Sequence, residues 1–280
     1  MNSVLVVGAT GNVGRQVVAR LAAAGVGTRA LARDPAAAGL PDGVEVVRGD
    51  LAEPASLAAA ADGVDSVLLV WPFPGSENAE QVVRVLSAGA RRVVYLSSTS
   101  VNDQGPQSDL IPLLHAEMEG LIRTYISEWT VLRADTLASN ALGWAGQIRA
   151  GDIVRGTGVA PSAVVHEGDI AAVAVRLLTE SGHAGRIYRV TGPRVVGRAE
   201  QVEAIGAALG RALRFEALPG AVVRESMTAA GLPARLIETL VSMAEFRPRS
   251  ELVTTTVADL TGRPARDIRE WAAEHVEDFR

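Results

Sequence analysis

Val4-Leu5-Val6-Val7-Gly8-Ala9-Thr10-Gly11-Asn12-Val13-Gly14 lies near the start of the chain and decides its fold. The apolar run predicts a buried strand, the glycines a tight turn, and the residues from Arg15 to Ala24 a helix. At such a junction the backbone N–H groups and the dipole of the helix N-terminus can hold a pyrophosphate. We therefore predict an NAD(P) site at Gly8, Thr10, Gly11, Asn12, Val13 and Gly14. The alternative is a structural turn whose glycines bind no ligand.

Apolar runs alternate with segments of helical periodicity over the first two thirds of the chain. We expect strands near residues 3–7, 27–32, 43–48, 65–71, 91–97, 129–134 and 186–191. We expect helices between them, near residues 12–24, 54–62, 76–89, 109–127, 137–149 and 167–180. This order predicts an α/β fold, a Rossmann-type doubly wound parallel sheet covered by helices on both faces.

The alternation stops after Gly192-Pro193, and the rest of the chain is mostly helical in pattern. The candidate helices there are Ala199 to Leu209, Ala221 to Ala230 and Leu232 to Ala244. We expect residues 1–193 to form the NAD(P)-binding core, with residues 136–165 contributing to the substrate side. Residues 194–280 are expected to form a smaller, mostly helical C-terminal lobe.

The composition excludes several classes of function. The 280 residues are 48% hydrophobic and carry a net charge of −5 with no basic run, so we expect no nucleic-acid partner. No stretch reaches the roughly 18 apolar residues of a membrane span, and the chain starts with a core strand, so we expect no signal peptide, no membrane and a cytoplasmic location. The partners that remain are a small-molecule substrate and, in a homodimer, a second copy of the chain.

Cysteine is absent, and His115, His166, His183 and His275 show no ligand spacing, so we predict no metal. Lysine is absent too, and all 27 basic residues are arginine. The GxxGxxG spacing resembles the extended and atypical branches of the short-chain dehydrogenase/reductase superfamily. The Tyr-x-x-x-Lys pair of its ordinary members is impossible here, and arginine does not simply replace that lysine. A genomic base bias explains the missing lysine without restoring the function.

The residues after each expected strand should line the site, because ligands bind at the carboxyl ends of parallel strands. Arg33 falls where NAD-specific relatives carry an acid, and its charge suits a 2′-phosphate, which favours NADP(H) over NAD(H). Asp34 follows one position later and could accept from a ribose hydroxyl instead. Arg33 could also be a solvated turn residue.

Two further strand ends supply candidate cofactor residues. Asp50 resembles the adenine contact of the superfamily, with Leu51 covering the ring; a helix N-cap is the other role open to Asp50. Trp71 and Pro72 predict a rigid apolar wall beside the cofactor riboses.

Ser97 and Ser98 follow the next strand, where reductases of this superfamily keep a hydroxyl that faces the substrate carbonyl. The alternative is that these serines belong to an ordinary polar loop.

His115 and Glu119 are four residues apart on an expected helix and share one face, with the spacing of the missing Tyr and Lys. This pair, with Trp129 to Arg133 and Asn140, resembles the NmrA-like atypical short-chain family, which includes NAD(P)H:quinone oxidoreductases and azoreductase-like proteins. The segments that begin at His166, Tyr188 and Leu260 fit the same pattern. His115 could donate a proton near neutral pH or hydrogen-bond a carbonyl, and Glu119 could orient its ring. A helix-face pair without chemistry is the alternative.

The resemblance implies an NADPH-dependent reductase of a quinone-like or conjugated carbonyl compound. Hydride transfer to a quinone leaves a stabilised phenolate that water can protonate, so a site without lysine is compatible with this reaction. The family also contains redox-sensing regulators and pathway enzymes. A non-catalytic NADP(H) sensor therefore stays open, as does a biosynthetic isomerase or cyclase with a structural or recycled dinucleotide.

Overall fold

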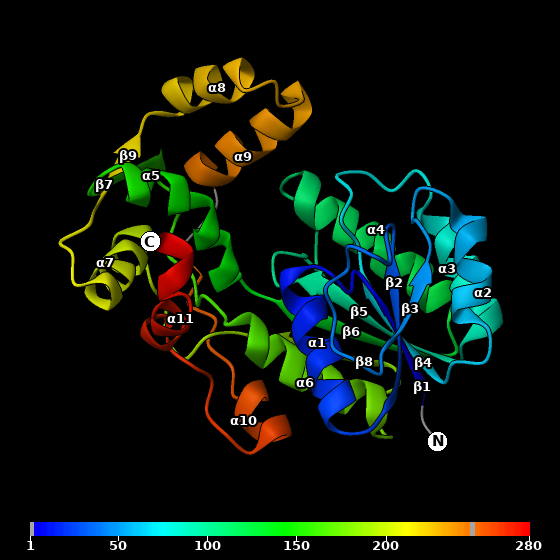
Figure 1. The fold of residues 1–280 in the computed structure, drawn as a ribbon. Helices are drawn as coiled ribbons and strands as arrows, with labels where there is room; N and C mark the ends of the chain where they lie inside the picture. Colours follow the sequence, from blue (N-terminus) through cyan, green and yellow to red (C-terminus); the bar gives the residue numbers. More distant parts are fainter. Residues whose placement is uncertain (1–2, 247–249) are drawn as a thin grey trace.

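The computed structural model of the chain describes residues 3–246 and 250–280. Its main layer is a sheet of seven strands in the order β3-β2-β1-β4-β5-β6-β8, all parallel (Figure 1). The strands are β1 (Ser3–Val7), β2 (Gly27–Ala32), β3 (Glu45–Arg48), β4 (Ser66–Val70), β5 (Arg92–Ser98), β6 (Glu128–Ala134) and β8 (Arg186–Val190). Each overlaps a strand expected from the sequence, and the predicted Rossmann-type α/β fold is confirmed.

The order of the strands reverses between β1 and β4. β1 pairs with β2 on one side and with β4 on the other. The chain therefore adds β2 and β3 on one side of β1, and then crosses back to add β4 and the later strands on the other side. Open parallel sheets bind ligands outside the carboxyl ends of the strands at such a reversal. The turn from Gly8 to Gly14 follows β1 directly, so the topology places it there.

Alternate residues of β1 supply the two apolar cores. Val4 and Val6 pack with α1 (Asn12–Ala23) and α6 (Glu167–Thr179) on one face of the sheet. Leu5 and Val7 pack with α3 (Ala79–Gly89) and α4 (Leu110–Tyr125) on the other face (Figure 1). Because both faces of a parallel sheet are covered, the strand reads as an unbroken apolar run in the sequence.

Two of the expected helices are broken into short pieces. The segment near 54–62 forms η1 (Pro54–Leu57) and α2 (Ala58–Ala61), and the segment near 137–149 forms η2 (Ala138–Trp144) and α5 (Ala145–Ala150). The second segment contains Asn140 and Gly143, whose low helix propensity accounts for a 3₁₀ start rather than one continuous α-helix.

The C-terminal region contains the expected helices α7 (Arg198–Leu209), α8 (Gly220–Ala229) and α9 (Ala234–Phe246). One of its strands, β9 (Arg214–Leu218), pairs in parallel with β7 (Ile153–Thr157) of the segment 136–165, and the sequence analysis missed both strands. Arginine and glycine interrupt the apolar pattern of β7, and β9 is half polar, so neither shows a clear strand signal. The division at residue 193 stays a prediction.

The last helices of the chain pack against both the lobe and the core. α10 (Thr256–Thr261) packs against α6 and β8, whereas α11 (Ile268–Glu274) packs against α7 and is followed by η3 (Val276–Phe279). Trp271 is fully buried in the core of the lobe, and its indole N–H donates to Glu167 of α6. This contact joins the C-terminal segment to the nucleotide-binding part of the chain.

Helices α8 and α9 form a hairpin with an apolar cluster of its own, made of Val223, Ile237 and Val241. In Figure 1 the hairpin lies at the top of the view, apart from the seven-stranded sheet. In the part of the chain that the structure describes, no helix is both long and apolar enough to cross a membrane.

Two helical glycines are expected to respond in opposite ways to alanine. A Cβ at Gly14 would lie 2.0 Å from the carbonyl oxygen of Gly8, whereas a Cβ at Gly120 would meet nothing within 4 Å. We expect Gly14→Ala to lower the free energy of unfolding by about 1–3 kcal/mol through overpacking. Gly120→Ala should raise it by about 0.5–1 kcal/mol by removing the entropic cost of glycine. Urea titration of the three proteins tests this, and an equal change in both variants would contradict the close approach of α1 to the Gly8 turn.

Candidate active site

The turn after β1 has the geometry of a pyrophosphate site. Gly8 has a φ of 86° and its added Cβ would lie 2.9 Å from Val70 Cβ, so this position requires glycine. Gly11 is the N-cap of α1 and offers no side chain to the helix. The first N–H groups of α1 are therefore available to a ligand. Thr10, Gly11 and Asn12 are exposed, whereas Val13 and Gly14 are buried and can contribute only their backbones.

A cavity of about 450 Å³ opens beside this turn. It is lined by residues that follow β1, β2, β3 and β4, so the strand ends converge there as predicted. The lining residues are Val7, Gly8, Thr10, Gly11, Leu31, Ala32, Arg33, Gly49, Asp50, Leu51, Val70, Pro72 and Phe73. We call it the nucleotide cavity. The structure thus brings together Gly8, Thr10, Gly11, Arg33, Asp50, Leu51 and Pro72 of the predicted cofactor residues.

Arg33 and Asp34 differ in their availability to a ligand. Arg33 is exposed, lines the nucleotide cavity and makes no hydrogen bond or ion pair with any residue that the structure describes. Asp34 does not line the cavity, and its Oδ1 accepts the N–H of Ala36 at 3.1 Å. The cation is thus the freer of the two groups.

The side chain of Asp50 stabilises a turn and does not cap a helix. Its Oδ1 accepts the N–H of Ala52 at 2.9 Å, whereas the N-cap of the next helix, η1, is Glu53. The N-cap alternative for Asp50 is therefore wrong. Leu51 is buried beside it in the wall of the cavity.

Trp71 holds the loop after β4 in place. Its indole N–H donates to the carbonyl oxygen of Gly75 at 2.8 Å, and its ring meets Phe73 edge to face at 5.3 Å between centroids. Pro72 lines the nucleotide cavity, whereas Trp71 lines a second, larger cavity. Val70 lines both, so the two cavities adjoin at the end of β4.

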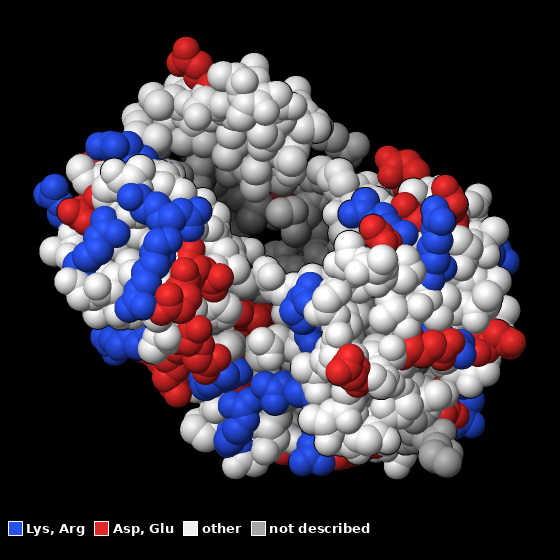
Figure 2. Space-filling view, in the orientation of Figure 1, with Lys and Arg blue, Asp and Glu red and all other residues white. Residues whose placement is uncertain are grey.

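The second cavity has a volume of about 630 Å³ and lies between the strand ends and the C-terminal lobe. The core contributes Trp71, Ser97, Ser98 and His115, the segment 136–165 contributes residues of η2 and β7, and the C-terminal lobe contributes residues of α7, α8 and α9. Figure 2 shows a hollow at this place, beneath the α8–α9 hairpin. We call it the substrate cavity.

His115 is held by a tyrosine. Its Nδ1 lies 2.7 Å from the hydroxyl of Tyr95, a fully buried residue of β5. Burial lowers the pKa of His115 to about 4, and the charge of Glu119 offsets only part of this effect. Burial also raises the pKa of Tyr95 above its usual range. At neutral pH both groups are uncharged, which favours the second role expected of His115, a hydrogen bond to a carbonyl, over proton donation.

The tyrosine also selects the tautomer of the ring. No other acceptor for the Tyr95 hydroxyl exists among the described residues, so this hydroxyl donates to Nδ1. The remaining proton of the neutral imidazole is then on Nε2. His115 therefore presents a neutral N–H donor, and its ring lines the substrate cavity.

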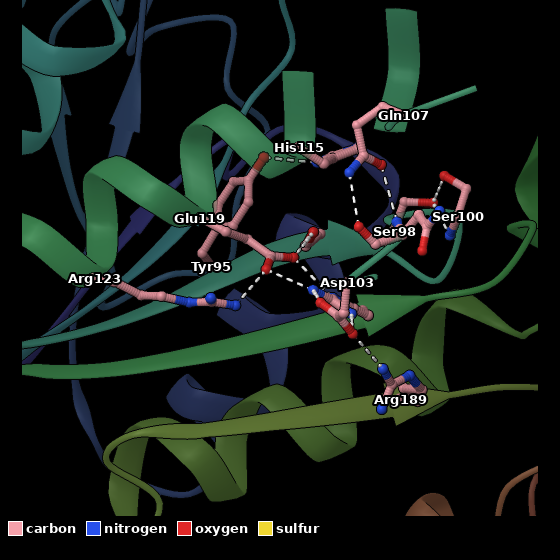
Figure 3. A network of polar contacts seen from close by, with 12 residues as sticks. Tyr95, Ser98, Ser100, Asp103, Gln107, His115, Glu119, Arg123 and Arg189 are labelled. Carbon is pink, nitrogen blue, oxygen red and sulfur yellow. Dashed lines mark hydrogen bonds and ion pairs between the residues drawn. The ribbon is translucent and has the colours of Figure 1, made fainter. Parts of the chain in front are cut away.

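Glu119 does not orient His115, contrary to the prediction. Its carboxylate accepts from Arg133 Nε at 2.9 Å, from an Arg133 Nη at 2.8 Å and from Arg123 at 2.8 Å (Figure 3). It also accepts from the hydroxyl of Ser97 at 2.7 Å. His115 and Glu119 do share one face of α4, but Glu119 is buried against β6. A buried carboxylate needs hydrogen-bond donors, and Arg133 of β6 supplies two of them there.

The two predicted serines therefore differ. The hydroxyl of Ser97 is used by Glu119, which makes Ser97 a link between β5 and α4. Ser98 lies at the cavity wall with its Oγ 2.8 Å from that of Ser100. Either serine hydroxyl of this second pair can be the donor, so Ser98 has a lone pair or a proton to offer a ligand.

Two residues of the substrate cavity escaped the sequence analysis. Asp135 follows β6 directly and is buried, with Oδ1 accepting from the N–H of Thr136 and Oδ2 without any described partner. The strand-end rule applied to β6 would have found it. Arg198 comes from α7, and no local sequence signal connects this helix to the cavity. Among residues 3–246 and 250–280 no cluster of His, Asp or Glu is arranged to hold a metal ion.

Comparison with known proteins agrees with this geometry. A family model described as NAD(P)H-binding matches residues 8–181. The chain is 42% identical to the (4-alkanoyl-5-oxo-2,5-dihydrofuran-3-yl)methyl phosphate reductase of Streptomyces griseus and 33% identical to the NAD(P)H azoreductase of Xenophilus azovorans, each over 99% of both chains. It also resembles the structure of NADPH-dependent quinone oxidoreductase from Escherichia coli with NADPH, with a TM-score of 0.78 and 23% identity over 98% of this chain and 99% of that one.

The family match covers more than half of the chain, and two relatives exceed 30% identity over nearly the whole length. The match begins at Gly8, the first residue of the glycine turn, and includes the elements from α1 to α6. The resemblance to the NmrA-like atypical short-chain dehydrogenase/reductases is confirmed, and the chain belongs to the NAD(P)H-binding family.

Proposed function

We propose that this protein is an NADPH-dependent reductase that acts on a conjugated carbonyl or quinone-like small molecule. The observation that carries the proposal is the junction of two cavities at Val70: one beside the glycine turn, and one lined by His115, Ser98 and Asp135. The relative from S. griseus supports it, since the compound in its name has a ring C=C bond conjugated to two carbonyl groups that are attached to the same ring carbon.

The residues present fit a dinucleotide. The N-terminus of α1 would hold the pyrophosphate, and the wall formed by Leu51 and Pro72 would cover the adenosine. Arg33 would pair with a 2′-phosphate, which supports NADP(H) over NAD(H). When bound, NADPH supplies the hydride that the substrate carbon accepts.

His115 would stabilise the charge that hydride addition places on the substrate oxygen. A neutral Nε2–H donor needs no charge of its own to do so, and a neutral imidazole can polarise a carbonyl in this way. The proton that completes the reduction comes from water, because the described part of the cavity wall offers no tyrosine and the chain has no lysine. Substrates that delocalise the negative charge, such as enones and quinones, depend least on this hydrogen bond from His115.

NADPH oxidation in the presence of quinones, enones and ketones tests the proposal directly. Sustained turnover with a conjugated substrate is the expected result. Tight NADPH binding with no turnover on any of them would contradict it and favour a sensor. Product formation without net NADPH consumption would favour an isomerase or cyclase.

We expect Arg33→Ala to weaken NADPH binding roughly tenfold or more, because a charge-assisted contact contributes about 1.5–3 kcal/mol. NADH binding should not change. Calorimetric titration of both cofactors measures the difference. Arg48→Ala is the matched control, since Arg48 is exposed at the end of β3 and does not line the nucleotide cavity. An equal loss for both cofactors in Arg33→Ala would contradict the 2′-phosphate contact.

The low pKa of His115 predicts a loss of stability in acid. The folded ring has a pKa of about 4 and the unfolded ring about 6.5, so the unfolded state binds more protons between these values. The free energy of unfolding therefore falls as the pH decreases through 6.5, and at pH 5 the protonation of His115 lowers it by about 2 kcal/mol. Denaturant titrations of wild type and His115→Phe at pH 7 and 5 should differ by this amount. The same pH dependence in both proteins would contradict the assignment.

His115→Phe should also separate substrates by their need for a hydrogen-bond donor. For a ketone, we expect the single-turnover rate to fall about 10²-fold, the usual cost of removing an oxyanion donor. For a quinone the loss should be much smaller, because the charge spreads into an aromatic ring. His183→Phe is the control, since His183 lines neither cavity. Wild-type rates on both substrates would remove His115 from the reaction, and equal large losses would indicate substrate positioning.

A further inference from the structure

The substrate cavity has a wall far from the strand ends that the proposed reaction does not explain. Leu218, Val223, Met227 and Leu240 make much of this wall apolar. Trp144 of η2 and Arg198 of α7 line the cavity as well. A flat or alkyl part of a substrate suits the apolar side chains, but the arginine needs a separate explanation.

Arg198 is a half-buried cation without a counter-charge. It makes no hydrogen bond or ion pair with any residue that the structure describes, and its guanidinium carbon lies 5.7 Å from the ring centre of Trp144. Burial lowers its pKa, and no carboxylate offsets this effect. A cation that loses water without gaining a partner costs free energy, and one aromatic face repays only a small part of that cost.

The other arginine that lines the cavity, Arg155, has an ion-pair partner. Arg155 of β7 donates from Nε to Glu216 at 3.0 Å, across the β7–β9 pair. The acidic residue in the cavity lining is Asp135, which belongs to the strand-end wall and forms no ion pair with Arg198 within 4 Å. The described part of the chain therefore supplies no anion for Arg198, whereas the cavity leaves it accessible to a ligand.

We infer that Arg198 binds an anionic group, a phosphate ester or a carboxylate, carried by the conjugated substrate. This inference rests on the proposed function and narrows its substrate class. A guanidinium can donate two parallel hydrogen bonds to either group, and the low polarity around Trp144 strengthens them. The methyl phosphate in the name of the S. griseus relative is consistent with the first of these groups.

The test uses three forms of one α,β-unsaturated lactone that differ in a single substituent: hydroxymethyl, its phosphate ester, or carboxymethyl. We expect wild-type kcat/KM to be about tenfold or more higher for an anionic form than for the hydroxymethyl form. Whichever anion gains more identifies the group. Arg198→Met should remove most of this preference through KM rather than kcat, and Arg198→Lys should keep part of it. Arg214→Met, the matched control, should keep the wild-type ratio, because Arg214 is exposed at the start of β9 and does not line the cavity.

No preference in the wild-type protein, or an unchanged preference in Arg198→Met, would overturn the inference. Failure of the proposed function looks different, because none of the three forms would then be reduced. In that case calorimetry with the saturated lactone phosphate and the NADP⁺-loaded protein tests Arg198 alone. Binding at least about tenfold weaker in Arg198→Met supports the anion site, and equal binding in both proteins overturns it. Unchanged NADPH affinity shows that the variant is folded.

Discussion

The buried ion pair between Glu119 and Arg133 holds the strand-end wall of the substrate cavity together. It joins α4 to β6, and the hydroxyl of Ser97 ties β5 to the same carboxylate. Arg133 also makes two hydrogen bonds to Asp103, at 2.7 and 2.6 Å, which fastens the loop after β5 (Figure 3). Removing one member of such a pair leaves an uncompensated charge in the interior, at a cost of about 3–5 kcal/mol.

This pair also explains why the candidate catalytic groups stay in register. His115 lies one helical turn before Glu119, and Asp135 lies two residues after Arg133. A shift of α4 along the sheet would therefore move the His115 ring and break the three hydrogen bonds that Glu119 accepts from Ser97 and Arg133 at the same time. The position of the ring thus depends on contacts outside the cavity as well as on Tyr95.

Most of the fold, and part of the site, could be predicted from local sequence. The apolar run before Gly8 shows a strand buried on both faces, and the glycine spacing shows the turn, because both depend on neighbouring residues alone. The partner of His115 could not be predicted in this way. Helical spacing places His115 and Glu119 on one face, but only the packed sheet decides that Tyr95 meets the first and Arg133 the second. The strands β7 and β9 were missed because polar residues and glycine interrupt their own patterns, and because 56 residues, Gly158 to Leu213, separate two strands that become recognisable only when they pair.

The separate apolar cluster of the α8–α9 hairpin has a consequence for how such proteins diversify. Val223, Ile237 and Val241 pack mainly with one another, whereas Val223, Met227 and Leu240 also face the substrate cavity. Substitutions in the hairpin can therefore reshape the space offered to a substrate while the two apolar cores around the sheet keep their packing. Selection for a new substrate can act on this hairpin without disturbing the turn that binds the nucleotide.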